Sequence, residues 1–422
     1  MSNIAPVTAI SSATSAPVPE AEVPWRQDAS VIGLVGLAHA TSHFSHLLLP
    51  PLFPLLMAEF GLSFAQVGAL VTAFFVVSGV GQAASGFVVD RMGARPILFG
   101  SIFLFALSAA VAAGANGYAM LMLSAVLAGL GNAPFHPVDF SILNQRVSGP
   151  RLGYAFSAHG LAGNLGWALA PVSLVTLATV FHWRVAMLAA VALYAVVLLV
   201  LWRHRAFLHT HAVSGKRAPV GAAPASSLAF LQLPVVWWCF AFFFLSTMTL
   251  AVVQSFAPSI LQTVHGVGLQ AASATITAYM LCGAVGMLVG GVVAARAGYR
   301  SNRVVAVALV AGALLLLAAA SGVGGALGAM VALAATGFAV GVGGPSRDLM
   351  IKQATPKGAT GRVYGTVYSG LDVGFAVSPA LFGLMMDQGW YQATLAGAAL
   401  TLLLAVVAAL AVGQRSAAAG LR

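Results

Sequence analysis

Long apolar stretches separated by short polar joints dominate this chain of 422 residues. Each stretch is close to the length of about 20 residues that carries an α-helix across a hydrocarbon core of about 30 Å. Twelve stretches of this kind predict twelve transmembrane helices. They are expected at residues 31–57, 66–88, 97–113, 119–143, 153–179, 185–202, 235–262, 271–294, 304–320, 326–349, 362–386 and 391–413.

A short pattern after the second predicted helix recurs after the eighth one. The offset between the copies is constant at 205 (291 − 86), and a second match at an offset of 208 relates Asn164 to Asp372. The repeat predicts an all-α membrane protein with two six-helix halves that insert in the same orientation. The matching joint residues are Gly86, Arg91, Gly93 and Arg95 in the first copy and Gly291, Arg296, Gly298 and Arg300 in the second.

The repeat and the polar segments divide the chain into five parts. The first 29 residues are rich in Ala, Ser and Pro and lack a basic start followed by an apolar core, so they predict a disordered cytoplasmic tail and no signal peptide. The other parts are an N-terminal bundle at 30–202, a cytoplasmic linker at 203–230, a C-terminal bundle at 231–413 and a cytoplasmic tail at 414–422.

The placement of basic residues predicts the orientation of the helices. The chain has 19 Lys and Arg against 9 Asp and Glu, with a formal net charge of +10. All of these cations except Arg184 and Arg347 lie before the first helix, after the last helix or in joints that follow an even-numbered helix. This asymmetry obeys the positive-inside rule with both termini cytoplasmic. It explains the excess of basic over acidic residues without a nucleic-acid partner.

Composition and missing motifs exclude several classes of protein. Hydrophobic residues make up 60% of the chain and charged residues 7%, against about 25% charged residues in ordinary soluble domains. No Gly-x-Ser-x-Gly, His-Glu-x-x-His or phosphate-loop motif is present, so neither an enzyme nor an ATP-driven pump is expected. Cys239 and Cys282 lie in apolar stretches without metal-ligand spacing, and no disulfide, metal centre or cofactor is expected.

Residues 86–95 carry the most specific motif. With its second copy and the twelve predicted helices, Gly-Phe-Val-Val-Asp-Arg-Met-Gly-Ala-Arg resembles the loop signature of the major facilitator superfamily. This resemblance implies the major facilitator fold, and alternating access in which the loop latches one conformation. Asp90 would offer a carboxylate to arginines and helix termini of the other bundle, whereas Ala295 replaces it in the second copy. A positive-inside turn without a gating role is the alternative.

A narrower resemblance rests on the fourth and fifth predicted helices. Phe135-His136-Pro137, followed by Gly163-Asn164-Leu165-Gly166 and Pro171, is similar to the fosmidomycin-resistance branch of drug exporters. This likeness implies a monomeric proton antiporter of the inner membrane that exports drug-like compounds. Arg347 and Asp348 are not part of that pattern.

Three histidines in the first predicted helix form a narrow stripe. His39, His43 and His46 lie within about 60° of one another at 100° per residue, and the first two are roughly 12 and 18 Å from the expected helix start. The resemblance places this stripe toward the central cavity. Histidine changes charge near neutral pH, so a role in proton or substrate binding is predicted. Hydrogen-bonded packing and a transition-metal site are the alternatives.

Further polar residues within the predicted spans are candidates for cargo or proton binding, because such groups are costly in a bilayer. Asp372, about 16 Å deep, is expected to be the only carboxylate at the membrane midplane, and its repeat mate is Asn164. Proton coupling and a link between the second and eleventh helices are its two possible roles. His136, Asp139 and His159 are expected to form a polar group near the cytoplasmic mouth.

The remaining candidates lie in the second half. Arg347 and Asp348 point about 100° apart on one helix, so each is expected to have its own partner, with anion binding by Arg347 as the alternative. Gln254, Tyr279 and Tyr368 offer neutral hydrogen bonds. The predicted function is export of a small organic compound by proton antiport, with cargo, protons and the bilayer as partners. Proton-coupled uptake of a small organic anion is the alternative.

Overall fold

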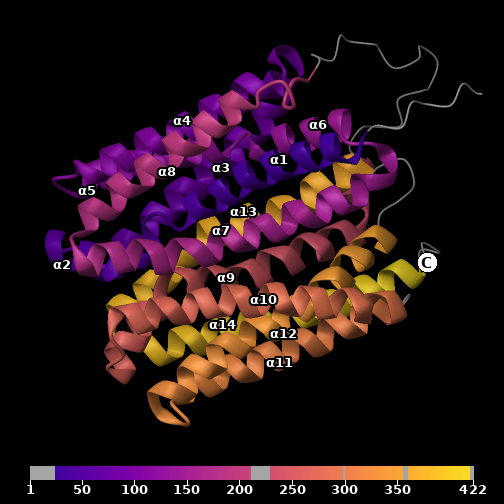
Figure 1. Ribbon diagram of the computed structural model, residues 1–422. Coiled ribbons are helices and arrows are strands. Elements are labelled where there is room, and N and C mark those ends of the chain that lie inside the picture. The colour runs from indigo at the N-terminus through magenta and orange to yellow at the C-terminus, as the bar shows by residue number, and fades with distance from the viewer. Residues whose placement is uncertain (1–23, 211–228, 298–299, 355–359, 419–422) are drawn as a thin grey trace, which may run out of the picture.

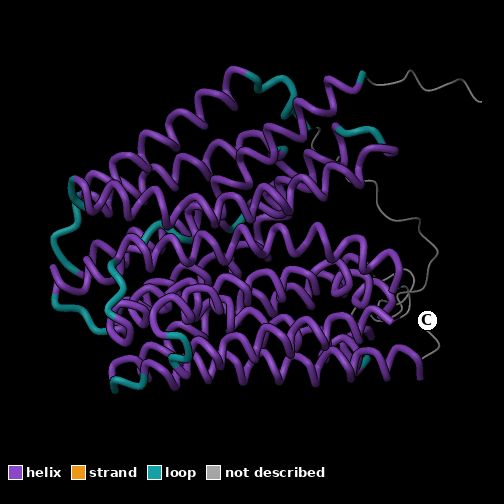
Figure 2. Tube along the Cα trace, turned by 60° about the horizontal axis from the view of Figure 1, so that its bottom comes forward, coloured by secondary structure: helices purple, strands orange, loops and turns teal. Residues whose placement is uncertain are grey.

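The computed structural model describes residues 24–210, 229–297, 300–354 and 360–418. All regular structure within these ranges is helical, and twelve segments are long and apolar enough to cross a membrane, as predicted. The helices run alongside one another, and the N-terminal half lies against the C-terminal half (Figures 1 and 2).

Each half supplies six of these membrane-spanning segments. The first half contains α1 (Trp25–His46), η1 (Pro50–Leu52), α2 (Phe53–Phe60), α3 (Phe64–Met92), α4 (Ala94–Ala113), α5 (Tyr118–Asn132), α6 (Phe135–Arg146), η2 (Gly149–Arg151), α7 (Leu152–Val180) and α8 (Trp183–Arg203). The second half contains η3 (Ala229–Gln232), α9 (Pro234–His265), α10 (Leu269–Ala297), α11 (Ser301–Ser321), α12 (Gly325–Ala354), α13 (Thr360–Asp387) and α14 (Tyr391–Ala418).

Proline interrupts two of the predicted spans. The first span breaks into α1, η1 and α2 at Pro50 and Pro51, as expected for residues that cannot donate a backbone hydrogen bond. The fourth span breaks into α5 and α6 at Pro134, a break that the sequence analysis did not anticipate. After this second break α6 packs against α1, α3 and α4, with Asp139 buried in the N-terminal half.

The first helix begins six residues earlier than expected, and this changes the boundary of the tail. Trp25 starts α1, so residues 25–29 are helical and do not belong to the predicted tail. Asp28 is buried there and accepts hydrogen bonds from Ser148 and Arg151 in the joint between α6 and α7. The tail and linker residues 1–23, 211–228 and 419–422 lie outside the described part of the chain.

Twelve spans bring the start of α1 and the end of α14 to one end of the molecule. This end, here the terminal end, carries the start of α1, the end of α3 and the end of α14, and it lies toward the C label in Figure 1. The opposite end, here the distal end, carries the start of α3 and the end of α13.

One of the two interfaces between the halves is formed by α3 and α13. A Cβ on Gly68 would overlap the carbonyl of Pro379, so the lack of a side chain at Gly68 permits this close approach. One turn further along α3, Thr72 donates its hydroxyl to the carbonyl oxygen of Ala376 at 2.6 Å. Both contacts lie between the distal end and the middle of the two helices.

The same interface continues to the middle of the molecule. Phe75 and Phe375 stack with ring centroids 4.3 Å apart and planes at 7°. One turn closer to the terminal end, a Cβ built on Gly79 would lie 3.2 Å from Cβ of Asp372. Asp372 therefore lies directly against α3. It is one turn closer to the terminal end than the pair of aromatic rings that joins the two halves.

The second interface is formed by α7 and α10 and follows the same plan. Thr277 donates its hydroxyl to the carbonyl oxygen of Ala168 at 2.8 Å, and the Asn164 amide donates to Sδ of Met287 at 3.4 Å. Asn164 and its repeat mate Asp372 thus occupy corresponding positions at the two interfaces, which supports the predicted duplication.

Candidate functional site

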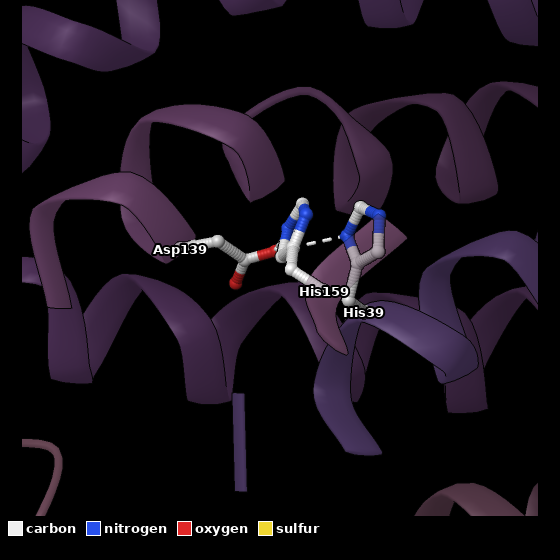
Figure 3. Close-up of side chains that lie close together, drawn as sticks. All are labelled: His39, Asp139 and His159. Carbon is white, nitrogen blue, oxygen red and sulfur yellow. Dashed lines mark hydrogen bonds and ion pairs between the residues drawn. The ribbon is translucent and has the colours of Figure 1, made fainter. Parts of the chain in front are cut away.

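A buried carboxylate between two histidines lies inside the N-terminal half. Asp139 on α6 is 0% exposed, and its Oδ2 lies 2.9 Å from Nδ1 of His39 on α1 and 3.0 Å from Nε2 of His159 on α7. Figure 3 shows both rings turned toward this carboxylate. We call His39, Asp139 and His159 the His–Asp–His group.

The composition of this group differs from the prediction. The sequence placed His136 and Asp139 together because they are three residues apart on one helix, but His136 points elsewhere. Its side chain is exposed, and its Nδ1 lies 3.0 Å from Oε1 of Gln82 on α3. The third member is His39, which helical spacing could not connect to a residue 100 positions away.

Charge balance limits how many protons the His–Asp–His group can hold. An ionised carboxylate only accepts hydrogen bonds, so both imidazoles donate an N–H to Oδ2. With both rings neutral the group carries one negative charge, and one additional proton makes it neutral. The rings of His39 and His159 stack at 3.5 Å, so protonation of both would place like charges in contact away from water. The group therefore suits the uptake and release of one proton.

The same three residues also have a donor set that suits a transition metal. Their ligand atoms lie within 4.8 Å of one another. A metal shared by these atoms would displace both hydrogen bonds, because each nitrogen would have to give up the proton that it donates to Oδ2. Oδ2 lies 2.9 and 3.0 Å from the two nitrogens, which are hydrogen-bond distances. This arrangement favours hydrogen bonding over metal coordination.

The predicted histidine stripe of α1 is present and extends from this group toward the distal end. Ring centroids are 4.4 Å apart between His39 and His43 and 4.9 Å apart between His43 and His46. His43 is packed against Trp167, and its buried Nδ1 has no hydrogen-bond partner among the described residues. A Cβ on Gly163 would lie 2.6 and 2.7 Å from atoms of the His43 ring, so Gly163 provides the space for this histidine.

The last histidine of the stripe is held as a neutral ring. The indole N–H of Trp167 points to Nδ1 of His46 at 3.3 Å, and Nε2 of His46 lies 3.0 Å from Oδ1 of Asn132. Asn132 in turn donates its amide to Ser78 at 2.8 Å, so its oxygen faces His46 and His46 donates. The sequence analysis did not single out Asn132 or Trp167. An amide in the middle of an apolar helix was the available signal for Asn132.

The structure corrects the prediction that Asp372 is the only carboxylate deep in the spans. Asp139 lies beside His39, which the sequence itself placed near the midplane, and therefore shares that depth. Asp372 is half-buried against Gly79 and makes no hydrogen bond with a described side chain. The chain thus has two candidate proton-binding carboxylates, one inside a bundle and one at the interface of the bundles.

The prediction of separate partners for Arg347 and Asp348 is wrong. Nε of Arg347 lies 2.9 Å from Oδ1 of Asp348, because the flexible side chains close the angle between their Cα–Cβ directions. The Arg347 guanidinium also lies 5.3 Å from the centre of the Phe243 ring, and Tyr368 packs on the same ring at 4.7 Å. This cluster joins α12, α9 and α13, and the Asp348 carboxylate offsets the positive charge of Arg347.

The other predicted residues of the second half are buried. Gln254 is 4% exposed, and its Nε2 has no hydrogen-bond partner among the described residues. Its position corresponds to His46 at the repeat offset of 208 (254 − 46), so the two residues occupy equivalent places in α9 and α1. Tyr279 is 5% exposed on α10.

The loop motif lies at the terminal end of α3. Gly93 ends the helix with a φ of +79°, a conformation that favours glycine, and the next amide, of Ala94, donates to Thr210 at 2.8 Å. Asp90, Arg91 and Met92 are exposed, and Asp90 makes no ion pair with a described side chain. In the second copy Gly291 and Arg296 lie at the end of α10 and Arg300 precedes α11, while Gly298 lies outside the described residues.

Comparison with known protein families gives a match to the family described as Major Facilitator Superfamily. The match covers residues 35–347 and, in a second alignment, residues 274–420. Together these segments span nearly all of the described helices.

Two curated relatives and one solved structure illustrate the similarity. The probable L-galactonate transporter of Escherichia coli (strain K12) is 26% identical over 56% of this chain and 54% of its own length. The fosmidomycin resistance protein of the same strain is 27% identical over 65% of this chain and 67% of its own length. The chain therefore spans about half to two thirds of these relatives.

The solved structure is a bacterial homologue of the human lysosomal transporter Spinster, in an inward-facing and occupied conformation. It aligns with a TM-score of 0.70 and 14% identity, over 95% of this chain and 98% of that protein. At this identity the likeness shows the fold alone.

Proposed function

The chain belongs to the major facilitator superfamily, and we propose that it is a proton-coupled secondary transporter whose proton binds to the His–Asp–His group. The chain is a multi-pass membrane protein and a transporter, not an enzyme. The observation that carries the proposal is the buried oxygen of Asp139, which accepts hydrogen bonds from two stacked histidines.

Proton binding to this group has a route from the terminal end. His136 is exposed, and its ring lies 5.8 Å from His39 and 6.5 Å from His159. We infer that His136 passes protons to the buried group through one intervening water or a ring movement. Basic residues cluster at the terminal end, so the proposal places this end in the cytoplasm and the protein in the inner membrane.

The proposed cargo is a small organic compound that is exported in exchange for protons. The motif in α6 and α7 and the similarity to a fosmidomycin resistance protein support export. Antiport requires that the transporter does not bind cargo and proton at the same time. The neutral, protonated His–Asp–His group and its negatively charged, deprotonated form supply two states that bind cargo differently.

Comparison of two carboxylate variants tests the assignment of the proton site. Asp139→Asn is expected to reduce the accumulation of cargo driven by a pH gradient at least about tenfold, while exchange of cargo across the membrane continues. Asp372→Asn is the matched variant, since it removes the second carboxylate that lies deep in the spans with equally little change in volume. Proteoliposomes with an imposed pH gradient and fosmidomycin or L-galactonate as trial cargo provide the measurement.

The two variants separate the alternatives. Loss of coupling in Asp139→Asn with coupling retained in Asp372→Asn supports the proposal. The reverse result would move the proton site to the interface carboxylate, as the sequence alone suggested. Full coupling in Asp139→Asn would contradict the proposal.

A second candidate function is proton-coupled uptake of a small organic anion. It is favoured by Arg347, which is 32% exposed on the C-terminal half, and by the similarity to a probable L-galactonate transporter. Asp348→Asn removes the carboxylate that neutralises Arg347 and is expected to raise affinity for an anionic cargo. Unchanged affinity for L-galactonate together with active export of fosmidomycin would count against this candidate.

A further inference from the structure

A charged contact joins the two halves at the distal end. Asp387, the last residue of α13, accepts hydrogen bonds from the backbone N–H groups of Phe64 at 2.6 Å and Ala65 at 2.9 Å. These are the first two residues of α3. A carboxylate of one half therefore caps a helix of the other half.

The start of α3 gives this contact a physical basis. The first N–H groups of a helix lack partners within the helix and carry partial positive charge. Ser63 and Gln66 satisfy each other in a capping box, which leaves the amides of Phe64 and Ala65 for an external acceptor. The carboxylate of Asp387 supplies one oxygen to each, so the cap is complete only while α13 lies against α3.

The repeat supplies an uncharged counterpart at the other interface. Thr179 corresponds to Asp387 at the offset of 208 (387 − 179), and Gln270 corresponds to Ala65 at the offset of 205 (270 − 65). Gln270 donates its amide to the hydroxyl of Thr179 at 2.9 Å. Equivalent positions of the repeat thus close the distal ends of both interfaces, but only one of them uses a charge.

We propose that Asp387 is a positioning residue of the transport cycle, which holds the distal side shut by capping α3 and must release that helix before the distal side opens. The Thr179–Gln270 bond is the weaker partner of this latch. Asp90, at the other end of α3, is exposed and makes no ion pair with a described side chain while Asp387 is engaged. One acidic group therefore acts at each end of α3, Asp387 of α13 at its start and Asp90 of α3 itself at its end, and the two act in opposite states.

The latch can be tested without cargo and without a proton gradient, so its failure is separate from a failure of the proposed proton site. Spin labels at Phe181 and Val323, which are exposed near the distal ends of the two halves, report how far these ends separate. The labels are introduced after replacement of Cys239 and Cys282. Asp387→Asn keeps the size of the side chain but removes its charge. The ratio of molecules with the open distance to molecules with the closed distance is expected to rise about tenfold.

Three further variants complete the experiment. Glu59→Gln is the matched control, because Glu59 is also a carboxylate of the distal end but bonds Trp183 and Arg184 within its own half, and it is expected to leave the distances unchanged. Thr179→Val is expected to give a smaller shift than Asp387→Asn. Asp387→Glu keeps the charge and is expected to restore the closed distances.

The outcomes decide the proposal. A folded Asp387→Asn variant with wild-type distances, or an equal shift in Glu59→Gln, would overturn it. If Asp387→Asn does not fold, Asp387→Ser decides in its place: open distances support the latch, and wild-type closed distances refute it.

Discussion

At the scale of single residues, the space around His43 is the most sensitive feature of the site. Gly163 lies against its ring, and a Cβ there would also lie 3.2 Å from Cδ2 of His39. Gly163→Ala is therefore expected to displace the His43 ring and to push the His39 ring away from its hydrogen bond with Asp139. Overpacking of this kind costs about 1–3 kcal/mol, and proton-coupled transport is expected to fall at least about tenfold.

Gly160 supplies the control for this prediction. It lies one turn earlier on α7, and an added Cβ would meet no atom within 4 Å. Gly160→Ala is expected to keep wild-type transport and to stabilise the helix slightly. The comparison uses the pH profile of transport and the thermal unfolding temperature in detergent. Similar pH profiles for the two alanine variants would show that the histidine stripe is not part of the coupling site.

Sequence reasoning found the residue types of the site and part of its grouping. It placed Asp139 and His159 in one polar group with His136 and assigned His39 to the stripe of the first helix, because polar groups within apolar spans are rare. It assigned partners by spacing along one helix, which is why His136 was paired with Asp139. The actual contacts join α1, α6 and α7, and their geometry depends on the helix break at Pro134. No pattern within a single helix contains that information.

At the scale of helices, the contact of Asp28 shows how a residue assigned to a tail holds a span in place. Asp28 is 1% exposed and accepts hydrogen bonds from Arg151 at 2.9 Å and from the hydroxyl and amide of Ser148 at 2.5 and 3.2 Å. The predicted tail included this segment, because the first 29 residues are rich in Ala, Ser and Pro and contain acidic residues such as Asp28. Its polarity instead serves a buried contact with the joint between α6 and α7.

Replacement of this carboxylate tests its contribution to stability. Asp28→Ala leaves the partners in the joint without an acceptor and is expected to lower the free energy of unfolding by about 1–3 kcal/mol. Arg26→Ala, two residues earlier at an exposed position, is expected to have little effect. Thermal unfolding of the purified protein measures both. Equal destabilisation by the two variants would mean that the contact contributes no more than the exposed start of α1.

The number and order of the helices followed from the sequence, whereas their ends and breaks did not. Apolar stretches of membrane-spanning length recur twelve times and leave little freedom in the count. Helix ends project beyond the apolar stretch, so α12 and α14 each end five residues later than hydrophobicity indicated. The breaks depend on which prolines the neighbouring helices accommodate, since Pro171, Pro258, Pro345 and Pro379 lie inside continuous helices.

At the scale of the whole molecule, duplication and charge combine in a particular way. The repeat gives both interfaces the same plan, but the acids are present in only one copy. At the equivalent positions of the other copy, Asn164 replaces Asp372, Thr179 replaces Asp387 and Ala295 replaces Asp90. A symmetric pair of interfaces would open and close without preference between them. All three acids belong to α3 or α13, and Asp372 and Asp387 contact α3 from the other half, so we expect charge to control that interface and the α7–α10 interface to follow.

The same charge distribution predicts the orientation of the molecule in the membrane, which can be measured directly. The basic joints lie at the terminal end, so the linker at 203–230 is expected to face the cytoplasm and the joint after α9 the opposite side. In a variant lacking Cys239 and Cys282, a single cysteine at Gly215 should resist a membrane-impermeant thiol reagent applied to intact cells. A cysteine at His265 should react, because this residue is half-buried at the distal end of α9. Permeabilised cells provide the control, in which both positions should label. Labelling of position 215 in intact cells would reverse the orientation, and the distal latch formed by Asp387 would then close the cytoplasmic side of the transporter.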